Sequence, residues 1–134
     1  MGAWGHEIFD NDAACDWLDS LIVRDDLSWI ESALEKVSQT DGFFHATEAS
    51  AALAACETLA HLRGNPGLHA ASLDELKRWV EQHRHLNSDH LVPVASTALV
   101  RIESDDCELK LHWQQGEQFD KWIATVEDVG RRLG

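Results

Sequence analysis

The sequence has 134 residues, of which 44% are hydrophobic and 26% are charged, and its formal net charge is -13. This length suits one globular domain with its own core, and no apolar run approaches the roughly 20 residues that span a membrane. So much negative charge repels phosphate backbones, so it disfavours nucleic-acid binding and favours a basic partner protein or a cation.

The N-terminus and the cysteines favour a reducing compartment. The segment Met1–His6 lacks the basic and long apolar regions of a signal peptide. Three cysteines lie far apart without a Cys-x-x-Cys spacing: Cys15, Cys56 and Cys107. This scatter favours small buried thiols over a disulfide framework or a zinc site. We therefore expect a soluble cytoplasmic protein, without a membrane segment or cofactor, whose oligomeric state stays open.

The helical period recurs along almost the whole chain, and no segment has the alternation of a convincing strand. The pattern predicts an all-α fold in which residues 1–134 form one compact bundle of about six to seven short helices. Helix pairs of similar length leave solenoid-like stacking possible, although no repeat period is evident.

The first predicted helix ends near Val23, and any of three residues can cap its start: Asp10, Asn11 or Asp12. Its apolar stripe contains Ala14, Trp17, Leu18 and Leu21. The second predicted helix begins after Asp25 or Asp26 and ends near Gln39. Its inward face contains Leu27, Ile30, Ala33, Leu34 and Val37.

The third predicted helix opens at Thr47 and runs to Leu62, before the strong turn signal at 64–67. Residues 49–56 are small and apolar around most of the helix circumference. This composition indicates a central helix that its neighbours approach closely on several sides.

Four further helices follow. Ser72 and Glu75 form a capping box for the fourth, which continues to about His83. The fifth covers about 89–103, with Pro93 in its opening turns, where proline is tolerated.

The sixth predicted helix is short. It begins after Ser104 and ends at Gly116, and the seventh runs from Glu117 to about Leu133.

Several segments resemble one known family. They are Met1-Gly2-Ala3-Trp4-Gly5, residues 9–14 and 16–18, residues 48–55, residues 64–66, Ser104-Asp105 with Glu108-Leu109, Trp113, and the helix around Trp122. This pattern resembles the bacterial family catalogued as domain of unknown function 4259, over nearly the whole chain. The resemblance implies a small helical bacterial protein and supplies no catalytic residues.

Glycines on both sides of Trp4 let this N-terminal arm pack tightly. We expect Trp4 and Trp17 to be largely buried and to hold the arm against the bundle. A binding groove built from the arm is the alternative.

The N-terminal third is the most acidic region: residues 1–48 contain 11 acidic residues and only two basic ones. Asp12, Asp16 and Asp19 share one helix face, opposite the apolar stripe. Such a face is either solvated surface or a docking surface for a basic partner. The predicted docking residues are Glu7, Asp10, Asp12, Asp16, Asp19, Asp25 and Asp26.

Two sets of side chains could be imagined as metal ligands. The first is His6 with Glu7, Asp10 and Asp12, which lacks the glycine and terminal glutamate of a calcium loop. The second is His83, His85 and His90, whose spacing straddles a helix end. We predict no tightly bound structural metal and assign no catalytic residue.

Three classes of function fit these observations. The favoured one is an acidic protein-binding domain, most concretely an immunity-type inhibitor that docks the basic surface of a cognate bacterial toxin. The others are a metal-dependent enzyme of unknown reaction and a non-catalytic helical scaffolding module.

Overall fold

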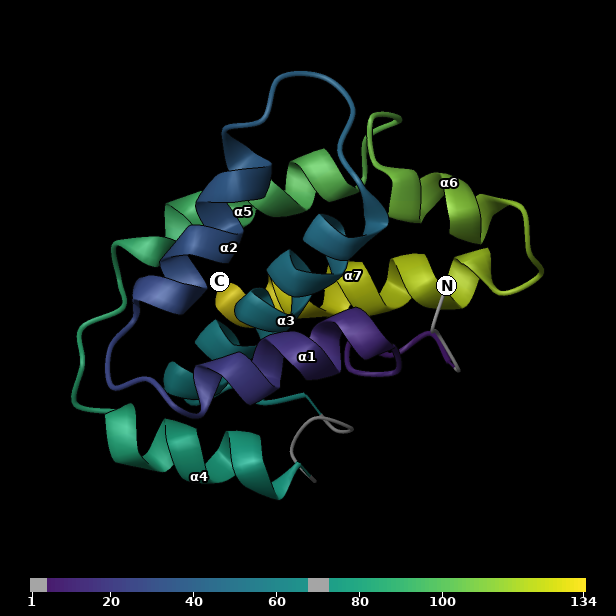
Figure 1. Ribbon diagram of the computed structural model, residues 1–134. Helices are drawn as coiled ribbons and strands as arrows, with labels where there is room; N and C mark the ends of the chain where they lie inside the picture. The colour runs from purple at the N-terminus through teal and green to yellow at the C-terminus, as the bar shows by residue number, and fades with distance from the viewer. Residues whose placement is uncertain (1–4, 68–72) are drawn as a thin grey trace.

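A computed structural model describes residues 5–67 and 73–134, which contain seven α-helices (Figure 1). Their bounds are α1 Asp12–Leu21, α2 Ser28–Ser38, α3 Ala46–Leu62, α4 Asp74–His83, α5 Leu91–Ile102, α6 Glu108–Gln114 and α7 Phe119–Leu133. Within these residues the only β-type pairing is one isolated bridge between Phe44 and Cys107. The predicted all-α bundle is confirmed.

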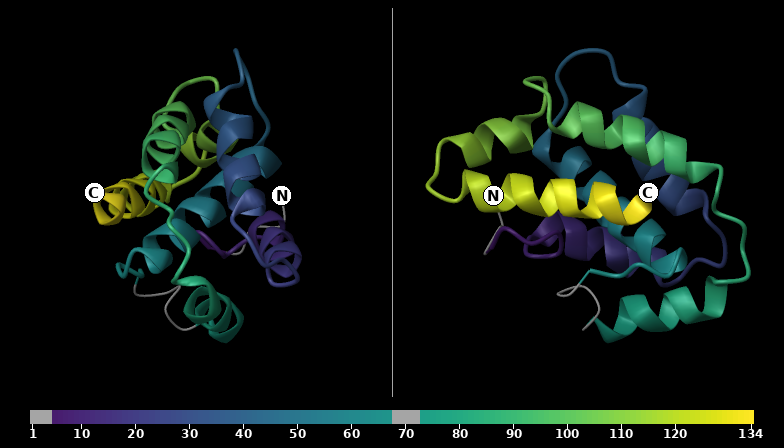
Figure 2. Two further views of the ribbon diagram at one scale, coloured as in Figure 1. Left: turned by 90° about the vertical axis from the view of Figure 1, so that its left-hand side faces the viewer. Right: turned by 180° about the vertical axis from the view of Figure 1, so that it is seen from behind.

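Helix α3 is the centre of the bundle and contacts each of the other six described helices. Its residues 52–61 are all buried, and most are alanine or other small residues, so neighbouring helices can approach closely. Figure 2 shows α5 and α7 side by side on one side of α3, with α1 and α2 on the other. The helices therefore surround α3 and do not stack as a solenoid, in which each unit contacts only its neighbours.

The predicted apolar stripes form the core. In α1 all four stripe residues are buried, and in α2 the buried residues are Ile30, Leu34 and Val37. Trp17 is 5% exposed, as predicted, and its carbonyl accepts a hydrogen bond of 3.1 Å from the indole of Trp29. Trp4 lies outside the described residues.

Helix α1 begins after Asn11, whose side chain accepts a hydrogen bond of 2.8 Å from the Ala14 amide. Asn11 is thus the cap among the three candidates. At the start of α2, the Asp26 carboxylate accepts hydrogen bonds from both the amide and the hydroxyl of Ser28. Ser72, the predicted cap of α4, lies outside the described residues.

Several helix starts differ from the predictions. Helix α2 has Leu27 at its N-cap in place of Asp25 or Asp26, and α7 begins at Phe119 in place of Glu117. Helix α3 begins at Ala46, not Thr47, because His45 and Glu48 form its capping box. The Glu108 carboxylate of α6 also accepts a hydrogen bond of 2.8 Å from the Ala46 amide. A partner 62 positions along the chain therefore helps to set this helix start.

Helix α5 begins at Leu91, after a turn in which the Leu91 amide bonds to the Ser88 carbonyl. Helix α6 begins at Glu108 because the Ser104 hydroxyl bonds to the Arg101 carbonyl and to the Asp106 amide. Ser104 therefore stabilises the turn before α6 and does not cap that helix.

None of the helices in the described residues is both long enough and apolar enough to cross a bilayer.

Candidate functional site

The predicted acidic stripe lies on the outer surface of α1. Asp12, Asp16 and Asp19 are all exposed, opposite the buried stripe of the same helix. Within the described parts of the chain, none of the three takes part in an ion pair, whereas other exposed carboxylates do. Asp89 lies 2.6 Å from Arg63, and Asp105 lies 2.9 Å from Lys110.

Two more predicted docking residues continue the acidity past the end of α1. Asp25 and Asp26 are exposed in the connection to α2. Asp25 lies 3.8 Å from the buried imidazole of His83, and hydrogen bonds from Ser28 lower the pKa of Asp26. Beside them Val23 is 80% exposed, so an apolar side chain adjoins the acidic surface.

The thiol of Cys15, in α1, lies near the carboxylates of Asp12, Asp16 and Asp19 of the same helix and near Asp10. Burial raises its pKa, and the negative charges of Asp19, Asp12, Asp16 and Asp10 raise it further. The carboxylates of α1 therefore act together as one negative field and not as isolated charges.

Glu7 and Asp10 lie in a different environment, in the wall of a pocket of about 440 Å³. Three segments that are distant in the sequence form this pocket. They are the N-terminal arm with His6–Asp10, the Pro66–Gly67 loop with Glu57 of α3, and one face of α7 with Lys121, Ala124, Thr125, Asp128 and Arg132. The structure thus divides the predicted docking set between an exposed helix face and a pocket.

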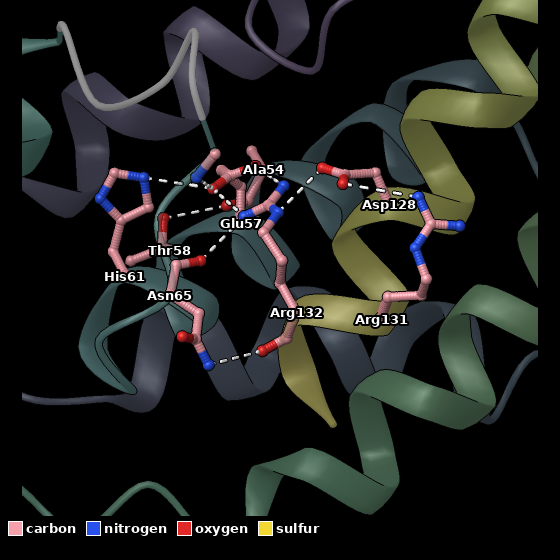
Figure 3. A network of polar contacts seen from close by, with 9 residues as sticks. Ala54, Glu57, Thr58, His61, Asn65, Asp128, Arg131 and Arg132 are labelled. Carbon is pink, nitrogen blue, oxygen red and sulfur yellow. Dashed lines mark hydrogen bonds and ion pairs between the residues drawn. The ribbon is translucent and has the colours of Figure 1, made fainter.

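A polar network that the sequence pattern did not predict lies beside this pocket (Figure 3). Glu57 is 3% exposed and forms two hydrogen bonds with the Arg132 guanidinium, of 2.6 and 2.7 Å. The Gly67 amide donates a third bond of 3.0 Å to Glu57, and His61 Nε2 lies 3.2 Å from the same carboxylate. Arg132 also donates to Asp128.

Burial by itself raises the pKa of Glu57. Its contact with His61, the hydrogen bonds and positive charge of Arg132 and the Gly67 amide outweigh this effect, and the pKa falls to about 2. Both carboxylate oxygens are engaged, so Glu57 anchors Arg132 and the loop at Gly67 and is not available as a general base.

A sequence signal for this network did exist. Glu57 and His61 are charged or polar residues four positions apart in a stretch, residues 49–62, that is otherwise small or apolar. A buried charge needs a partner. No local pattern identifies that partner, because Arg132 is 75 positions away.

The two imagined metal sets do not form ligand clusters. His83 is buried, stacks on Trp79 with ring centroids 4.1 Å apart, and bonds to the Trp79 carbonyl. His90 lies instead 4.0 Å from Glu31 of α2. In residues 5–67 and 73–134 no three His, Cys, Asp or Glu side chains are grouped so that they could hold a metal ion.

The sequence of residues 2–125 matches the family described as Domain of unknown function (DUF4259). The chain belongs to this family. The match confirms the resemblance inferred from the sequence. No curated protein and no solved structure gives a significant match to this DUF4259 member.

Proposed function

We propose that this DUF4259 protein is a non-catalytic binding module whose acidic face docks a basic partner protein. In its most concrete form, it is an immunity-type inhibitor that neutralises a cognate bacterial toxin. The acidic face consists of Asp12, Asp16, Asp19, Asp25 and Asp26. Glu7 and Asp10 are excluded from it because they line the pocket.

One observation carries the proposal: the Asp12, Asp16 and Asp19 carboxylates are exposed without an ion pair in the described chain. Like charges three and four positions apart destabilise a helix by a few tenths of a kcal/mol per pair. Asp12 is favoured by the helix dipole in the first turn of α1, but the repulsion of Asp16 by its two neighbours lowers the stability of the free helix. A basic partner would relieve the repulsion and would be steered toward the face by its field.

Exposed apolar side chains beside the acidic face also favour a docking role for this surface. Val23 is 80% exposed and Ile22 is 38% exposed at the end of α1, beside the acidic residues. Protein interfaces combine desolvated apolar anchors with a polar rim. We propose that Val23 enters an apolar depression on the partner while the carboxylates meet its basic residues.

A toxin that acts on nucleic acid fits this description. Its active surface is basic because it binds phosphates, and carboxylates can occupy the same sites. We place such an inhibitor in the cytoplasm, and the free thiols of Cys15, Cys56 and Cys107 fit a reducing compartment.

The test compares two double variants that change the net charge equally. Asp16→Asn/Asp19→Asn removes two carboxylates of the acidic face, and Asp89→Asn/Asp105→Asn removes two exposed carboxylates elsewhere. The partner to use is the basic protein encoded next to this gene or one that co-purifies. Association rates are measured by stopped-flow fluorescence over a range of salt concentrations. We expect the first variant to associate more slowly and with a shallower salt dependence, while the second resembles the wild type.

Equal rates for the two variants would refute the acidic face as the docking surface. The immunity role has its own test, in which the partner is expressed in a bacterial host with each form of this protein. Wild type and Asp89→Asn/Asp105→Asn should restore growth, and Asp16→Asn/Asp19→Asn should not. If the partner binds through the acidic face but is not toxic, this protein is a binding module and the immunity role is refuted.

A further inference from the structure

We propose that the pocket between the N-terminal arm and α7 binds a small zwitterion, namely an α-amino acid with an apolar side chain. This inference does not depend on the docking proposal, because it concerns a different surface and different residues.

The pocket has the size of a ligand site, and ion pairs and hydrogen bonds link its walls. Its volume of about 440 Å³ lies within the range typical of small-molecule sites. The Glu57–Arg132 ion pair fixes α7 relative to α3, and Asn65 strengthens this link by exchanging hydrogen bonds with Arg132. On the other side, His6 of the arm lies 3.4 Å from the Thr125 hydroxyl of α7. These contacts link the arm, α3 and α7 around the pocket.

Two opposite charges on different walls have no ion-pair partner among residues 5–67 and 73–134. Asp10, on the arm, accepts a single hydrogen bond, from the Glu7 amide. Lys121, on α7, forms no side-chain hydrogen bond or ion pair with any described residue, and it is not within ion-pair distance of Asp10. A molecule that carries an ammonium group and a carboxylate can satisfy both charges at once.

Arg132, eleven residues after Lys121 in α7, also lines the pocket. A guanidinium group has five N–H bonds. Those of Arg132 go to Asp128, to the two oxygens of Glu57 and to the Asn65 carbonyl, which accounts for four. The fifth, on Nη2, has no partner among the described residues.

The rest of the lining selects the body of the ligand. Ile8, Phe9, Pro66 and Ala124 supply an apolar wall between the charged groups. An apolar side chain buried there gains free energy in proportion to the area removed from water. An α-amino acid such as leucine combines the two charges with such a side chain.

Three related probes separate these contributions. L-Leucine carries both charges, L-leucinamide lacks the carboxylate, and N-acetyl-L-leucine lacks the ammonium group. Binding to the full chain is measured by calorimetry and by amide chemical shifts, which should move at Gly67, Lys121 and Thr125. We expect leucine to bind at least tenfold more tightly than either analogue, since a hydrogen bond to a charged group contributes that much.

Two variants test whether the ligand's carboxylate binds Lys121 on α7 and its ammonium group binds Asp10 on the arm. Lys121→Met should abolish the advantage of leucine over leucinamide and keep its advantage over N-acetyl-leucine. Asp10→Asn, which can still accept the Glu7 amide, should do the reverse. Lys77→Met and Asp74→Asn on α4 lie outside the pocket and should change neither ratio.

This pattern of crossed losses would establish the zwitterion site, because a merely structural role would weaken all three probes alike. Equal affinities of the three probes, shifts at residues away from the pocket, or no saturable binding of leucine at millimolar concentration would each overturn it. Lys121 is exposed, so its variant decides the matter even if Asp10→Asn fails to fold.

Discussion

Arg132 neutralises Glu57 at a place where little water remains, because the Glu57 side chain is 3% exposed and that of Arg132 is 18% exposed. Removing one member of a buried pair leaves the other charge uncompensated, whereas replacing both can be close to neutral. The adjacent Arg131 provides a control. Its side chain is 72% exposed and lies 3.6 Å from Asp128, so it forms only a surface pair.

Arg132→Met is expected to lower the free energy of unfolding by about 3–5 kcal/mol. Arg131→Met should lower it by less than about 1 kcal/mol, as surface pairs contribute little. The double variant Glu57→Leu/Arg132→Met should recover most of the loss. Urea denaturation followed by tryptophan fluorescence measures all three. Similar losses for the two arginine variants would mean that the buried pair is not what holds α7 to α3.

The same carboxylate predicts a pH dependence. The pKa of Glu57 is about 2 in the folded protein against 4.5 for an ordinary glutamate, so ionised Glu57 favours the folded state. Its contribution of roughly 3 kcal/mol is complete above pH 4.5 and is lost as the pH falls toward 2. The stability difference between wild type and Glu57→Gln should therefore shrink over this range. A difference that stays constant from pH 5 to pH 2 would contradict the prediction.

Glu103 provides a control of opposite sign. Burial raises its pKa, and so does the nearby charge of Glu127. An acid whose pKa is raised on folding favours the folded state only while it is protonated. Relative to Glu103→Gln, the wild type should lose stability as the pH rises through the pKa of Glu103.

At the scale of helices, α3 shows how packing limits substitution. Ala55 is 0% exposed in the interior of the bundle. Ala51, one turn earlier, borders a surface pocket of about 130 Å³ between α1, α2 and α3. A larger side chain therefore finds room at one position and none at the other.

Ala55→Leu is expected to destabilise the protein by about 1–3 kcal/mol or more, because it forces neighbouring helices apart. Ala51→Leu should change stability by less than about 0.5 kcal/mol, since its additional atoms can enter the pocket. Thermal unfolding of both variants tests the difference. Equal losses would show that the pocket is not available to an additional side chain.

Helix interiors could be predicted because their apolar spacing is a local property of the sequence. All of the predicted stripe of α1 is buried, and the small residues of α3 occupy the centre. Helix starts were less predictable, because distant groups take part. Glu108 bonds to the first residue of α3, and Ser104 is used in a turn instead of as a cap. The pocket could not be predicted from local sequence either, because three distant segments form it.

At the scale of the whole molecule, the net charge is -13, and only some of the exposed carboxylates form ion pairs within the described residues. Asp89 and Asp105 are paired with Arg63 and Lys110. Asp16 and Asp19 form no such pair within the described residues, and Asp19 lies in the last turn of α1, where the helix dipole disfavours a negative charge. The same change in net charge should therefore have opposite effects at the two places.

Asp16→Asn/Asp19→Asn is expected to raise the free energy of unfolding by about 0.5–1 kcal/mol at low salt, because it removes repulsion along α1. Asp89→Asn/Asp105→Asn, with the same net charge, should leave stability unchanged or slightly lower it. Urea is the denaturant to use, because it adds no ions. In 1 M NaCl, where the screening length is about 3 Å, the gain should largely vanish. If Asp16→Asn/Asp19→Asn is more stable alone but binds its partner more slowly, α1 gives up stability for docking. Carboxylates that only keep the protein in solution would not slow binding when they are removed. An unchanged or lower stability would remove the repulsion on which the proposal rests.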